Sequence, residues 1–431
     1  MNYTQTIEYL FATTPSFQVV GADAYKPGLE RVAEFCRLLG NPQNNFLTIH
    51  IAGTNGKGST SHMLASVLQH AGYRVGLFTS PHLRDFRERM RVDGRMISER
   101  RVVDFVAEHK EQMLKLGLSF FEITTAMAFN FFAESDVEVA VIETGLGGRL
   151  DATNIITPIL SVVTNIGLDH TDLLGNTLQA VAREKAGIIK QGVPVVLGEA
   201  SKEYNEVFEQ RAAALSSRVI YAEQEIELLE QCACSEGQMF RIERRRDNNR
   251  FTFILDLAGE YQNHNVLTVA AAADYLDQHT SISISRYAFL DGMATAAVST
   301  HLAGRWQILG RKPLVVCDTG HNAHGVKYVA EQLRSLSSSY DNIYCVLGFA
   351  RDKQIDDVLK LFPAQAHFVF TEASTPRALP AEELAAKGAE AGLKGEVIPS
   401  VREAYEWVRA RARQGDMIFV GGSNYVVAEI M

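Results

Sequence analysis

The sequence predicts an α/β protein with two domains, each built on a mainly parallel sheet. Short apolar runs rich in β-branched residues alternate with segments of helical periodicity along most of the chain. At 431 residues, the chain is longer than one ordinary core accommodates. The alternation breaks near residues 239–257 and begins afresh after Gly304-Arg305, so we expect the domain boundary near 298–304.

In the first domain, four apolar runs that end in small or polar residues predict buried parallel strands. These runs are residues 46–53, 74–80, 137–145 and 159–167. Between and after them, apolar residues at helical spacing predict helices over 59–70, 98–116, 122–134 and 177–190. Gly72 is a plausible C-cap of the first of these helices.

The segment 239–257 reads as an antiparallel hairpin, which we expect to extend the edge of the first sheet. Helical patterns resume at 262–277 and 285–297. In the second domain, strands are expected at 313–320, 342–349, 367–373 and 417–422, with helices from about 323 and over 381–391. This second series predicts a smaller parallel sheet.

The composition is that of a globular protein, with 46% hydrophobic and 22% charged residues. The net charge of −9 leaves no excess of Lys and Arg for a nucleic-acid backbone, so no nucleic-acid partner is expected. The one basic cluster, Arg244-Arg245-Arg246, stands beside Asp247 between two alternating segments, and it indicates a solvated hairpin turn.

The five cysteines are scattered and odd in number, as is typical of reduced thiols in a cytoplasmic protein. Cys232 and Cys234 have no second cysteine pair or histidine pair nearby, which argues against zinc. The chain start lacks a basic region followed by a long apolar run, and no run of about 18 apolar residues occurs. We therefore expect no signal peptide, no membrane span and a cytoplasmic location.

The stretch GTNGKGS, from Gly53 to Ser59, is a glycine-rich turn between a buried strand and an amphipathic helix. Such a turn directs backbone N–H groups and a helix dipole at an anion, and Lys57 adds a charge for the β- and γ-phosphates. A tight turn without a ligand is the alternative, and nucleotide binding is the better interpretation. Gly58 stands where a Ser or Thr normally contacts magnesium, so the oxygen ligands of that ion must come from elsewhere.

GTNGKGS resembles the variant phosphate loop of ATP-dependent amide ligases, which include the Mur ligases and folylpolyglutamate synthase. Further strings narrow the resemblance to the bacterial folylpolyglutamate synthase/dihydrofolate synthase family, a branch of the Mur ligase superfamily. They are TSPHL at 79–83, ETGLGGRLDATN at 143–154, IGLDH at 166–170, REKAGIIK at 183–190 and DTGHN at 318–322. Mur ligases carry an extra N-terminal uridine-nucleotide domain, and the roughly fifty residues before Gly53 are too few for one.

The resemblance implies a P-loop-containing parallel-sheet ATPase domain over residues 1–298 and a smaller, Rossmann-like, glutamate-binding α/β domain over 299–431. It also implies magnesium, expected as two ions. Ser80 is the position it assigns to one ion, and Ser59, which we expect to cap or begin a helix, is a possible substitute. Glu143 ends an apolar strand, so its carboxylate is expected at the carboxyl edge of the sheet, unless it pairs with an arginine such as Arg149. His170 follows a buried strand. A lone histidine is more often structural, but the resemblance makes this one a ligand of the second ion.

Lys185 lies in a predicted helix among the apolar residues 186–189. On composition alone, a lysine that extends its charged end to the surface is the favoured interpretation. The resemblance instead implies a lysine carbamylated by CO₂, which supplies an anionic oxygen to a metal beside His170. That reaction requires a buried amine with a lowered pKa. Lys190, at the expected helix end, is interpreted as solvated.

The resemblance further implies contacts with ATP at Asn265, Arg305 and Asp318, and within the loop at Thr54, Asn55, Gly56, Lys57, Gly58 and Ser59. Arg305, at the domain junction, is expected to reach the triphosphate only when the domains close. His321 is expected to help hold glutamate or the transferred phosphate. Tyr261 stands where the family usually has histidine, which puts that contact in doubt. The alternative for residues 318–322 is a helix-capping turn.

A pterin–benzoate pocket is implied at Lys26, Pro27, Gly28, Phe121, Glu122, Leu150, Asp151 and Ala152. Phe120 and Phe121 offer flat surface to a ring, as they do in an ordinary core.

We therefore predict an ATP-dependent ligase that adds L-glutamate to a folate or dihydropteroate carboxylate through an acyl phosphate, with Lys57, Lys185 and His321 as catalytic residues. Its partners are small molecules only, and a monomer is expected. The alternatives are a Mur-like ligase for another carboxylate, a P-loop kinase or NTPase, and a non-catalytic nucleotide-binding protein.

Overall fold

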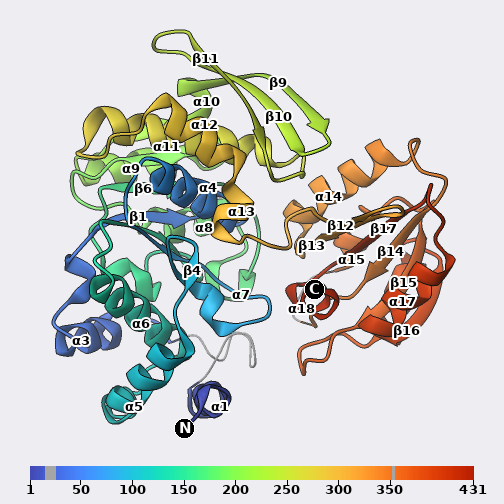
Figure 1. Ribbon diagram of the computed structural model, residues 1–431, viewed down its shortest axis with the longest axis horizontal. Helices are drawn as coiled ribbons and strands as arrows, with labels where there is room; N and C mark the ends of the chain where they lie inside the picture. The colour runs from blue at the N-terminus through green and yellow to red at the C-terminus, as the bar shows by residue number, and fades with distance from the viewer. Residues whose placement is uncertain (15–25, 352–354) are drawn as a thin grey trace. The chain divides into compact units, whose positions relative to one another are not determined.

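The computed structural model describes residues 1–14, 26–351 and 355–431, which form two compact units (Figure 1). The first unit comprises Met1–Asp256 and Gln262–Leu302, and the second comprises Leu257–Tyr261 and Ala303–Met431. The short segment Leu257–Tyr261 thus belongs to the second unit, although the chain on both sides of it belongs to the first. Among the described residues, no helix is both long enough and apolar enough to cross a membrane.

The first unit contains an eight-stranded sheet with the order β4-β3-β2-β5-β1-β6-β7-β8. All neighbours from β2 to β8 in this order pair in parallel, while β3 and β4 are antiparallel additions at one edge. β5 and β6 are buried at every residue, as the continuous apolar runs predict for strands covered on both faces. The strands are β1 (Leu47–Ala52), β2 (Val75–Phe78), β3 (Met90–Val92), β4 (Arg95–Met96), β5 (Val139–Glu143), β6 (Leu160–Val163), β7 (Val195–Leu197) and β8 (Val219–Tyr221).

Helices lie before, between and after these strands. They are α1 (Tyr3–Thr13), α3 (Glu30–Leu38), α4 (Lys57–His70), α5 (Glu99–Leu116), α6 (Phe120–Glu134), α7 (Thr171–Leu174), α8 (Leu178–Ala186), α9 (Asn205–Ala214), α10 (Ala222–Glu225), α11 (Gln262–His279), α12 (Arg286–Ala294) and α13 (Ala296–Thr300), with short 3₁₀ turns at Pro42–Asn44, Phe86–Arg89 and Ala152–Ile155. Of these, α4, α6 and α11 pack directly on the sheet. α4 is almost wholly buried, because it packs on the sheet and also against α11, α12 and α13.

One helix end and one helix cap differ from the sequence prediction. The helix expected over 177–190 ends at Ala186, because its last turn meets the loop before it in the chain: the N–H of Arg149 donates to the Glu184 carbonyl at 2.8 Å. A Cβ on Gly187 would lie 2.4 Å from the Arg149 Cα, so only glycine allows this approach. α4 ends at His70 with Ala71 as its C-cap, and Gly72 follows with φ +93°.

The hairpin expected to extend the main sheet is instead part of a separate three-stranded sheet, so that prediction was wrong. Its strands are β9 (Ile226–Cys234), β10 (Gly237–Arg244) and β11 (Asn249–Leu255), in the order β11-β10-β9. β9 was missed because its sequence, IELLEQCAC, has charged and small residues in place of clear alternation, and a bulge interrupts its pairing with β10.

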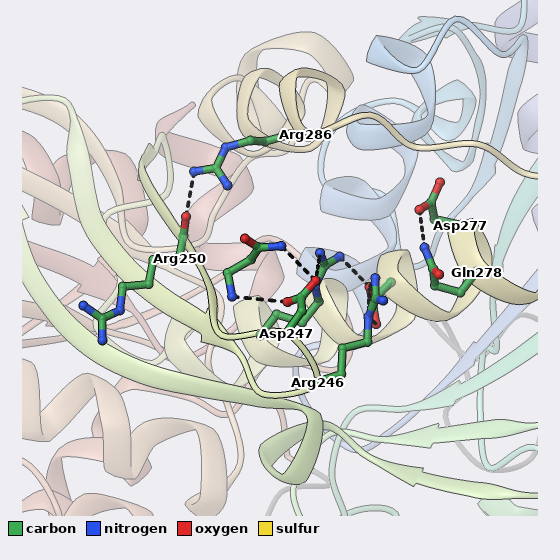
Figure 2. A network of polar contacts seen from close by, with 9 residues as sticks. Arg246, Asp247, Arg250, Asp277, Gln278 and Arg286 are labelled. Atoms are coloured by element: carbon green, nitrogen blue, oxygen red, sulfur yellow. Dashed lines mark hydrogen bonds and ion pairs between the residues drawn. The ribbon is translucent and has the colours of Figure 1, made fainter.

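The basic cluster at the β10–β11 turn is held by acidic partners (Figure 2). Arg244 and Arg246 both contact the Asp274 carboxylate on α11, at 2.7 and 3.0 Å, and Arg244 also pairs with Asp247. Arg286 donates to the Arg250 carbonyl at 2.6 Å. These contacts attach the three-stranded sheet to α11 and α12 and give Arg244 and Arg246 carboxylate partners.

The second unit contains a six-stranded sheet with the order β12-β13-β17-β14-β15-β16, in which only β12 is antiparallel. The strands are β12 (Gln307–Arg311), β13 (Leu314–Asp318), β14 (Ile343–Leu347), β15 (His367–Glu372), β16 (Gly395–Ser400) and β17 (Met417–Gly421). The helices are α14 (Ala323–Leu336), α15 (Asp356–Leu359), α16 (Ala381–Glu390), α17 (Val401–Arg411) and α18 (Asn424–Ile430). The parallel α/β series predicted after Gly304 is therefore present, with β12 and β16 as additional edge strands.

Candidate active site

Five neighbouring parallel strands of the first sheet end along one edge, and a polar or glycine residue follows or ends each of them. In spatial order, β2 leads to Ser80, β5 ends at Glu143, β1 leads to Gly53, β6 leads to Asn165 and β7 leads to Glu199. Ligands of parallel α/β sheets bind at this carboxyl edge. The order of the strands therefore brings together residues that are up to 146 positions apart in the sequence, from Gly53 to Glu199.

The loop between β1 and α4 depends on its glycines. Gly53 and Gly56 have φ values of +155° and +79°. A Cβ on Gly53 would lie 1.8 Å from the Thr164 hydroxyl, and one on Gly56 would lie 2.3 Å from Asn265 Oδ1. The backbone at both positions thus approaches neighbouring polar groups more closely than any side chain permits. α4 begins directly at Lys57, so its dipole and first N–H groups meet the loop.

Two lysines converge on one carbonyl of this loop. Lys57 Nζ donates to the carbonyls of Gly53 and Thr54, at 3.0 and 3.1 Å, and Lys185 Nζ donates to the Gly53 carbonyl at 2.7 Å. Lys185 is only 3% exposed. Burial, and then the nearby Lys57 charge, lower the pKa of Lys185 to about 7. Lys185 therefore does not extend its ammonium to the surface. With this pKa, a substantial fraction of its amine is neutral near pH 7.

Ser80 and Glu143 lie side by side at the ends of β2 and β5. The Ser80 N–H donates to Glu143 Oε2 at 3.1 Å, and the Glu143 side chain is buried. The alternative pairing of Glu143 with Arg149 does not occur, because Arg149 pairs with Glu184 at 2.9 Å. This corner of the site holds a buried carboxylate beside a serine.

His170 lies in the loop between β6 and α7. It has a left-handed backbone, with φ +50°, and its N–H donates to Asp169 Oδ1 at 2.8 Å. The same loop is joined to the phosphate loop, because Thr54 Oγ1 accepts from the Gly167 N–H at 2.9 Å and donates to the Gly167 carbonyl at 3.0 Å. Thr54 thus contributes its side chain to holding two loops together.

The donors at this edge fit a magnesium ion that takes most of its ligands from a bound triphosphate. Within the described part of the chain, no three His, Cys, Asp or Glu side chains gather into a metal site. The expected ligands include only two such residues, Glu143 and His170. Magnesium is commonly held by one or two protein groups together with substrate phosphates and water, so the oxygen donors Ser80 and Glu143 suit it, while His170 offers a nitrogen.

Asn265 and Ser59 lie where α11 crosses the start of α4. Asn265 is 5% exposed, and its Nδ2 donates to Gln262 Oε1 at 2.8 Å. Gln262 Nε2 in turn donates to Ser59 Oγ at 3.3 Å. Ser59 is the third residue of α4 and makes no capping bond there, so the capping role expected for it is absent.

The second unit brings Arg305, Asp318 and His321 to the carboxyl end of β13. The buried Asp318 carboxylate accepts from Tyr261 Oη at 2.6 Å, from the Trp306 N–H at 2.7 Å and from the Gly320 N–H at 2.7 Å. Burial raises the pKa of Asp318, and these hydrogen bonds oppose the shift. Tyr261, the position at which the resemblance left a ligand contact in doubt, therefore binds the aspartate directly.

Arg305 and His321 both contact Thr319, the residue after Asp318. Arg305 Nη1 donates to the Thr319 hydroxyl, and it also donates to the Gly304 carbonyl at 3.2 Å. His321 Nδ1 lies 3.0 Å from the Thr319 carbonyl. The helix-capping turn considered for 318–322 exists as well, because the Asn322 side chain accepts from the Gly325 N–H at the start of α14. Asn322 thus caps the helix, whereas the residues expected to contact a ligand are Asp318 and His321.

The residues expected at the pterin–benzoate pocket are connected by one arginine that the sequence did not indicate. Arg31 pairs with the buried Glu122 carboxylate at 3.1 Å and donates to the Lys26 carbonyl at 2.9 Å. Phe121, next to Glu122, packs on Gly145, where a Cβ would lie 2.5 Å from its ring. The segment 26–28, the start of α6 and the loop after β5 therefore meet, with Gly28 and Leu150 at partly buried positions and Pro27 exposed.

The contacts change what the sequence indicated for three residues, namely Phe120, Lys190 and Asp151. Phe120 is a core residue, stacked on Phe11 with ring centroids 4.8 Å apart, and it offers no free face. Lys190 is not fully solvated, since its Nζ donates to the Asn154 carbonyl at 2.8 Å. The Asp151 carboxylate is engaged inside its own loop, where it accepts from the N–H groups of Gly145 and Leu146, at 2.9 and 2.8 Å.

Asp151→Ala is expected to lower the free energy of unfolding by about 2–4 kcal/mol, because it leaves several buried donors without an acceptor. Besides two backbone N–H groups of the turn, Asp151 accepts from the N–H and hydroxyl of Thr153. Urea denaturation measures the change. The exposed Asp247→Ala is the control and should cost less; a loss below about 0.5 kcal/mol in Asp151→Ala would show that the turn does not depend on Asp151.

Comparisons with known proteins were consistent across both units. The Mur ligase middle domain profile matches residues 51–273, and the Mur ligase glutamate ligase domain profile matches residues 304–424. The chain is 33% identical over 421 residues to a Bacillus subtilis dihydrofolate synthase/folylpolyglutamate synthase, covering 94% of each chain. It is also 33% identical over 438 residues to a probable bifunctional folylpolyglutamate synthase/dihydropteroate synthase of Haloferax volcanii, of which it spans half the length.

Solved structures show the same likeness. A Mycobacterium tuberculosis folylpolyglutamate synthase complexed with ADP superposes with a TM-score of 0.88 at 29% identity, over 99% of this chain and 97% of that one. A bifunctional folylpolyglutamate synthase/dihydrofolate synthase with Mn, AMPPNP and L-glutamate bound has a TM-score of 0.84 at 27% identity, over 100% and 97% of the two chains.

Proposed function

Because this chain belongs to the Mur ligase family, in its folylpolyglutamate synthase/dihydrofolate synthase branch, we propose that it is an ATP-dependent ligase that joins L-glutamate to the carboxylate of a folate or of dihydropteroate. The observation that carries the proposal is the phosphate loop, with Lys57 and Lys185 on the Gly53 carbonyl, at the same sheet edge as Ser80 and Glu143. A relative with an ATP analogue, manganese and glutamate bound supports ATP and a divalent ion as requirements.

The chemistry needs activation, since an amine does not displace oxide from a carboxylate. A carboxylate oxygen of the folate attacks the γ-phosphorus of ATP, the bond to the β-phosphate oxygen breaks, and ADP and an acyl phosphate form. The amine of glutamate then attacks the carbonyl carbon, the C–O bond to phosphate breaks, and the amide loses a proton. Lys57 neutralises charge on the phosphoryl group during its transfer, and His321 holds glutamate or the transferred phosphate.

Magnesium, when bound, supplies positive charge to the phosphoryl oxygens. Ser80 and Glu143 would hold one ion, and His170 and a carbamylated Lys185 would hold a second. The unmodified Lys185 ammonium is unsuited to this role, because it is a donor without a lone pair. Its burial and its pKa of about 7 supply the neutral amine that CO₂ requires, which supports the modification.

As contacts of ATP we propose Thr54–Ser59, Asn265, Arg305 and Asp318, the positions that the family resemblance assigns. The pterin–benzoate group is proposed to lie against Phe121 and the segments 26–28 and 150–152. Asp151 and Glu122 serve there mainly to shape the pocket, because their carboxylates are held by their own loop and by Arg31. We further propose that the protein is a monomer in the cytoplasm. Its five free cysteines suit a reducing compartment. Size-exclusion chromatography with light scattering measures the mass in solution.

Glutamate incorporation, measured side by side with dihydropteroate and with tetrahydrofolate, tests this function and defines which acceptor is used. ADP release that requires both an acceptor and glutamate is the expected result. ADP release with the acceptor alone, together with a stable phosphorylated product, would favour the kinase alternative. Incorporation into neither compound would favour a Mur-like ligase with a different carboxylate, and binding of ATP without turnover would favour a non-catalytic protein.

Arg305→Ala is expected to raise the Michaelis constant for ATP by about tenfold or more while lowering the melting temperature by only about 2–4 °C. The variant loses hydrogen bonds to Gly304 and Thr319, each of modest stability, and it also loses the guanidinium proposed to meet the triphosphate. Steady-state kinetics and thermal melting measure both effects. Arg311→Ala, on the exposed end of β12, is the control. A large fall in melting temperature with an unchanged Michaelis constant would make Arg305 structural.

A further inference from the structure

We propose that Asn165 and Glu199 are positioning residues that hold the phosphate loop in its nucleotide-binding shape, although neither belongs to that loop. The Asn55 N–H donates to Asn165 Oδ1 at 2.9 Å, and Asn165 Nδ2 donates to Glu199 Oε1 at 2.8 Å. The three groups form a chain that runs from the loop after β1 through the end of β6 to the end of β7. This inference rests on the proposed nucleotide site and identifies what shapes it.

A second pair of contacts makes the attachment rigid. The Thr54 N–H donates to the Asn165 carbonyl at 3.1 Å, and the Thr54 hydroxyl exchanges hydrogen bonds with Gly167. Two successive residues of the phosphate loop are therefore fixed to the loop that follows β6. Because that second loop continues to Asp169 and His170, the attachment also sets the distance between the phosphate loop and His170.

The outer carboxylate decides which way the Asn165 amide faces. If the amide rotated by half a turn, its NH₂ group would point at the Asn55 N–H, and two donors would meet. Glu199 prevents this rotation, because a carboxylate accepts hydrogen bonds and donates none. Its backbone N–H donates to the Thr164 carbonyl at 3.0 Å, so the end of β7 holds it in place. Asn165 is 5% exposed, which leaves little water to replace a lost partner.

The hydrogen bond between Asn165 and Glu199 can be tested by exchanging the amide and the carboxylate between the two positions. Asn165→Asp keeps an acceptor for the Asn55 N–H but places a second carboxylate against Glu199. Glu199→Gln alone keeps an acceptor for Asn165 Nδ2. In the double variant N165D/E199Q, the amide introduced at position 199 can donate to the new carboxylate, and the total charge equals that of the natural pair. A double-mutant cycle therefore separates the pairing from the effect of each single change.

The experiment measures the dissociation constant for AMPPNP with magnesium by calorimetry, and the melting temperature, for the full chain and each variant. We expect N165D to bind about tenfold more weakly or worse, E199Q to stay within about threefold of wild type, and N165D/E199Q to return to within about threefold. The matched control is Asn342→Asp: Asn342 Nδ2 donates to Asp416 Oδ1 at 2.8 Å at the amino ends of β14 and β17. This control should lower the melting temperature without changing the dissociation constant.

The outcomes distinguish this inference from the function on which it rests. Absence of AMPPNP binding by the wild-type chain would refute the nucleotide site itself. Wild-type binding together with a folded N165D that binds equally well, or a double variant no better than N165D, would overturn the positioning role. Should N165D fail to fold, Glu199→Ala removes only the outer acceptor. We expect that variant to bind about fivefold more weakly, and unchanged binding would overturn the proposal.

Discussion

Lys57→Ala is expected to abolish measurable turnover, with a loss in kcat of about 1,000-fold or more. The ammonium lies at the first residue of α4, within 3.1 Å of two carbonyls of the phosphate loop. In the proposed mechanism this ammonium neutralises the charge that moves with the phosphoryl group, and neither the helix dipole nor backbone N–H groups replace it. The acyl phosphate should therefore fail to form. Coupled detection of ADP at saturating acceptor and glutamate measures the loss.

Two further variants show whether the effect of Lys57 is specific. Lys57→Arg keeps the charge, so it should retain part of the ATP affinity, but its planar guanidinium cannot align the γ-phosphate as the ammonium does. Lys190→Ala removes a partly buried lysine of the same unit that donates to a carbonyl, Asn154 O, and turnover should persist. Normal turnover in Lys57→Ala would refute the phosphate-loop interpretation.

Lys185→Ala is expected to be nearly inactive, and a short carboxylate such as formate or acetate should restore part of the activity. The physical reason is charge. A protonated lysine beside a metal ion is repelled by roughly 4 kcal/mol per unit charge at 4 Å and an effective dielectric constant of about 20. Lys185 also shares the Gly53 carbonyl with Lys57, so a second cation there is already disfavoured. Carbamylation replaces that cation with an anion.

Stability measurements separate a chemical role of Lys185 from a structural one. Replacing a buried ammonium by an apolar side chain of similar length is often neutral or stabilising, so Lys185→Met should fold at least as well as wild type and still be inactive. Enzyme equilibrated with ¹³C-labelled CO₂ should give a carbamate carbon signal that is absent from Lys185→Met. An Ala variant with full activity, and no such signal in the wild type, would leave the modification without support.

Local sequence patterns were sufficient to predict the parallel sheets, because buried strands and amphipathic helices have strong periodic signals. The phosphate loop was equally clear, since Gly53 and Gly56 occupy backbone positions that only glycine tolerates. The partners of charged residues were not predictable in the same way. Arg149 was a reasonable partner for Glu143, but the end of α8 brings Glu184 to it instead. Such choices depend on where separate elements meet.

Asn165 and Asp151 show why the contacts in the rest of the site were not predicted from the sequence. Asn165 follows a buried strand in the segment ILSVVTNIG, and a polar residue at a strand's carboxyl end was the available signal. Its contacts with Asn55 and Glu199 span three strands, which no local pattern contains. Asp151 was assigned to the substrate pocket, whereas its carboxylate binds the turn that precedes it. Tyr261 likewise has a partner, Asp318, that lies 57 positions away in the sequence.

If an acyl phosphate links ATP cleavage to amide formation, one oxygen of the reacting carboxylate must pass to the released phosphate. Dihydropteroate or tetrahydrofolate labelled with ¹⁸O in the reacting carboxylate is incubated with the enzyme, ATP, magnesium and L-glutamate, and the released phosphate is analysed by mass spectrometry. An acyl phosphate leaves with one carboxylate oxygen, so each phosphate should carry one ¹⁸O, and the amide should keep the other. Unlabelled phosphate, released while glutamate is still incorporated, would contradict the mechanism.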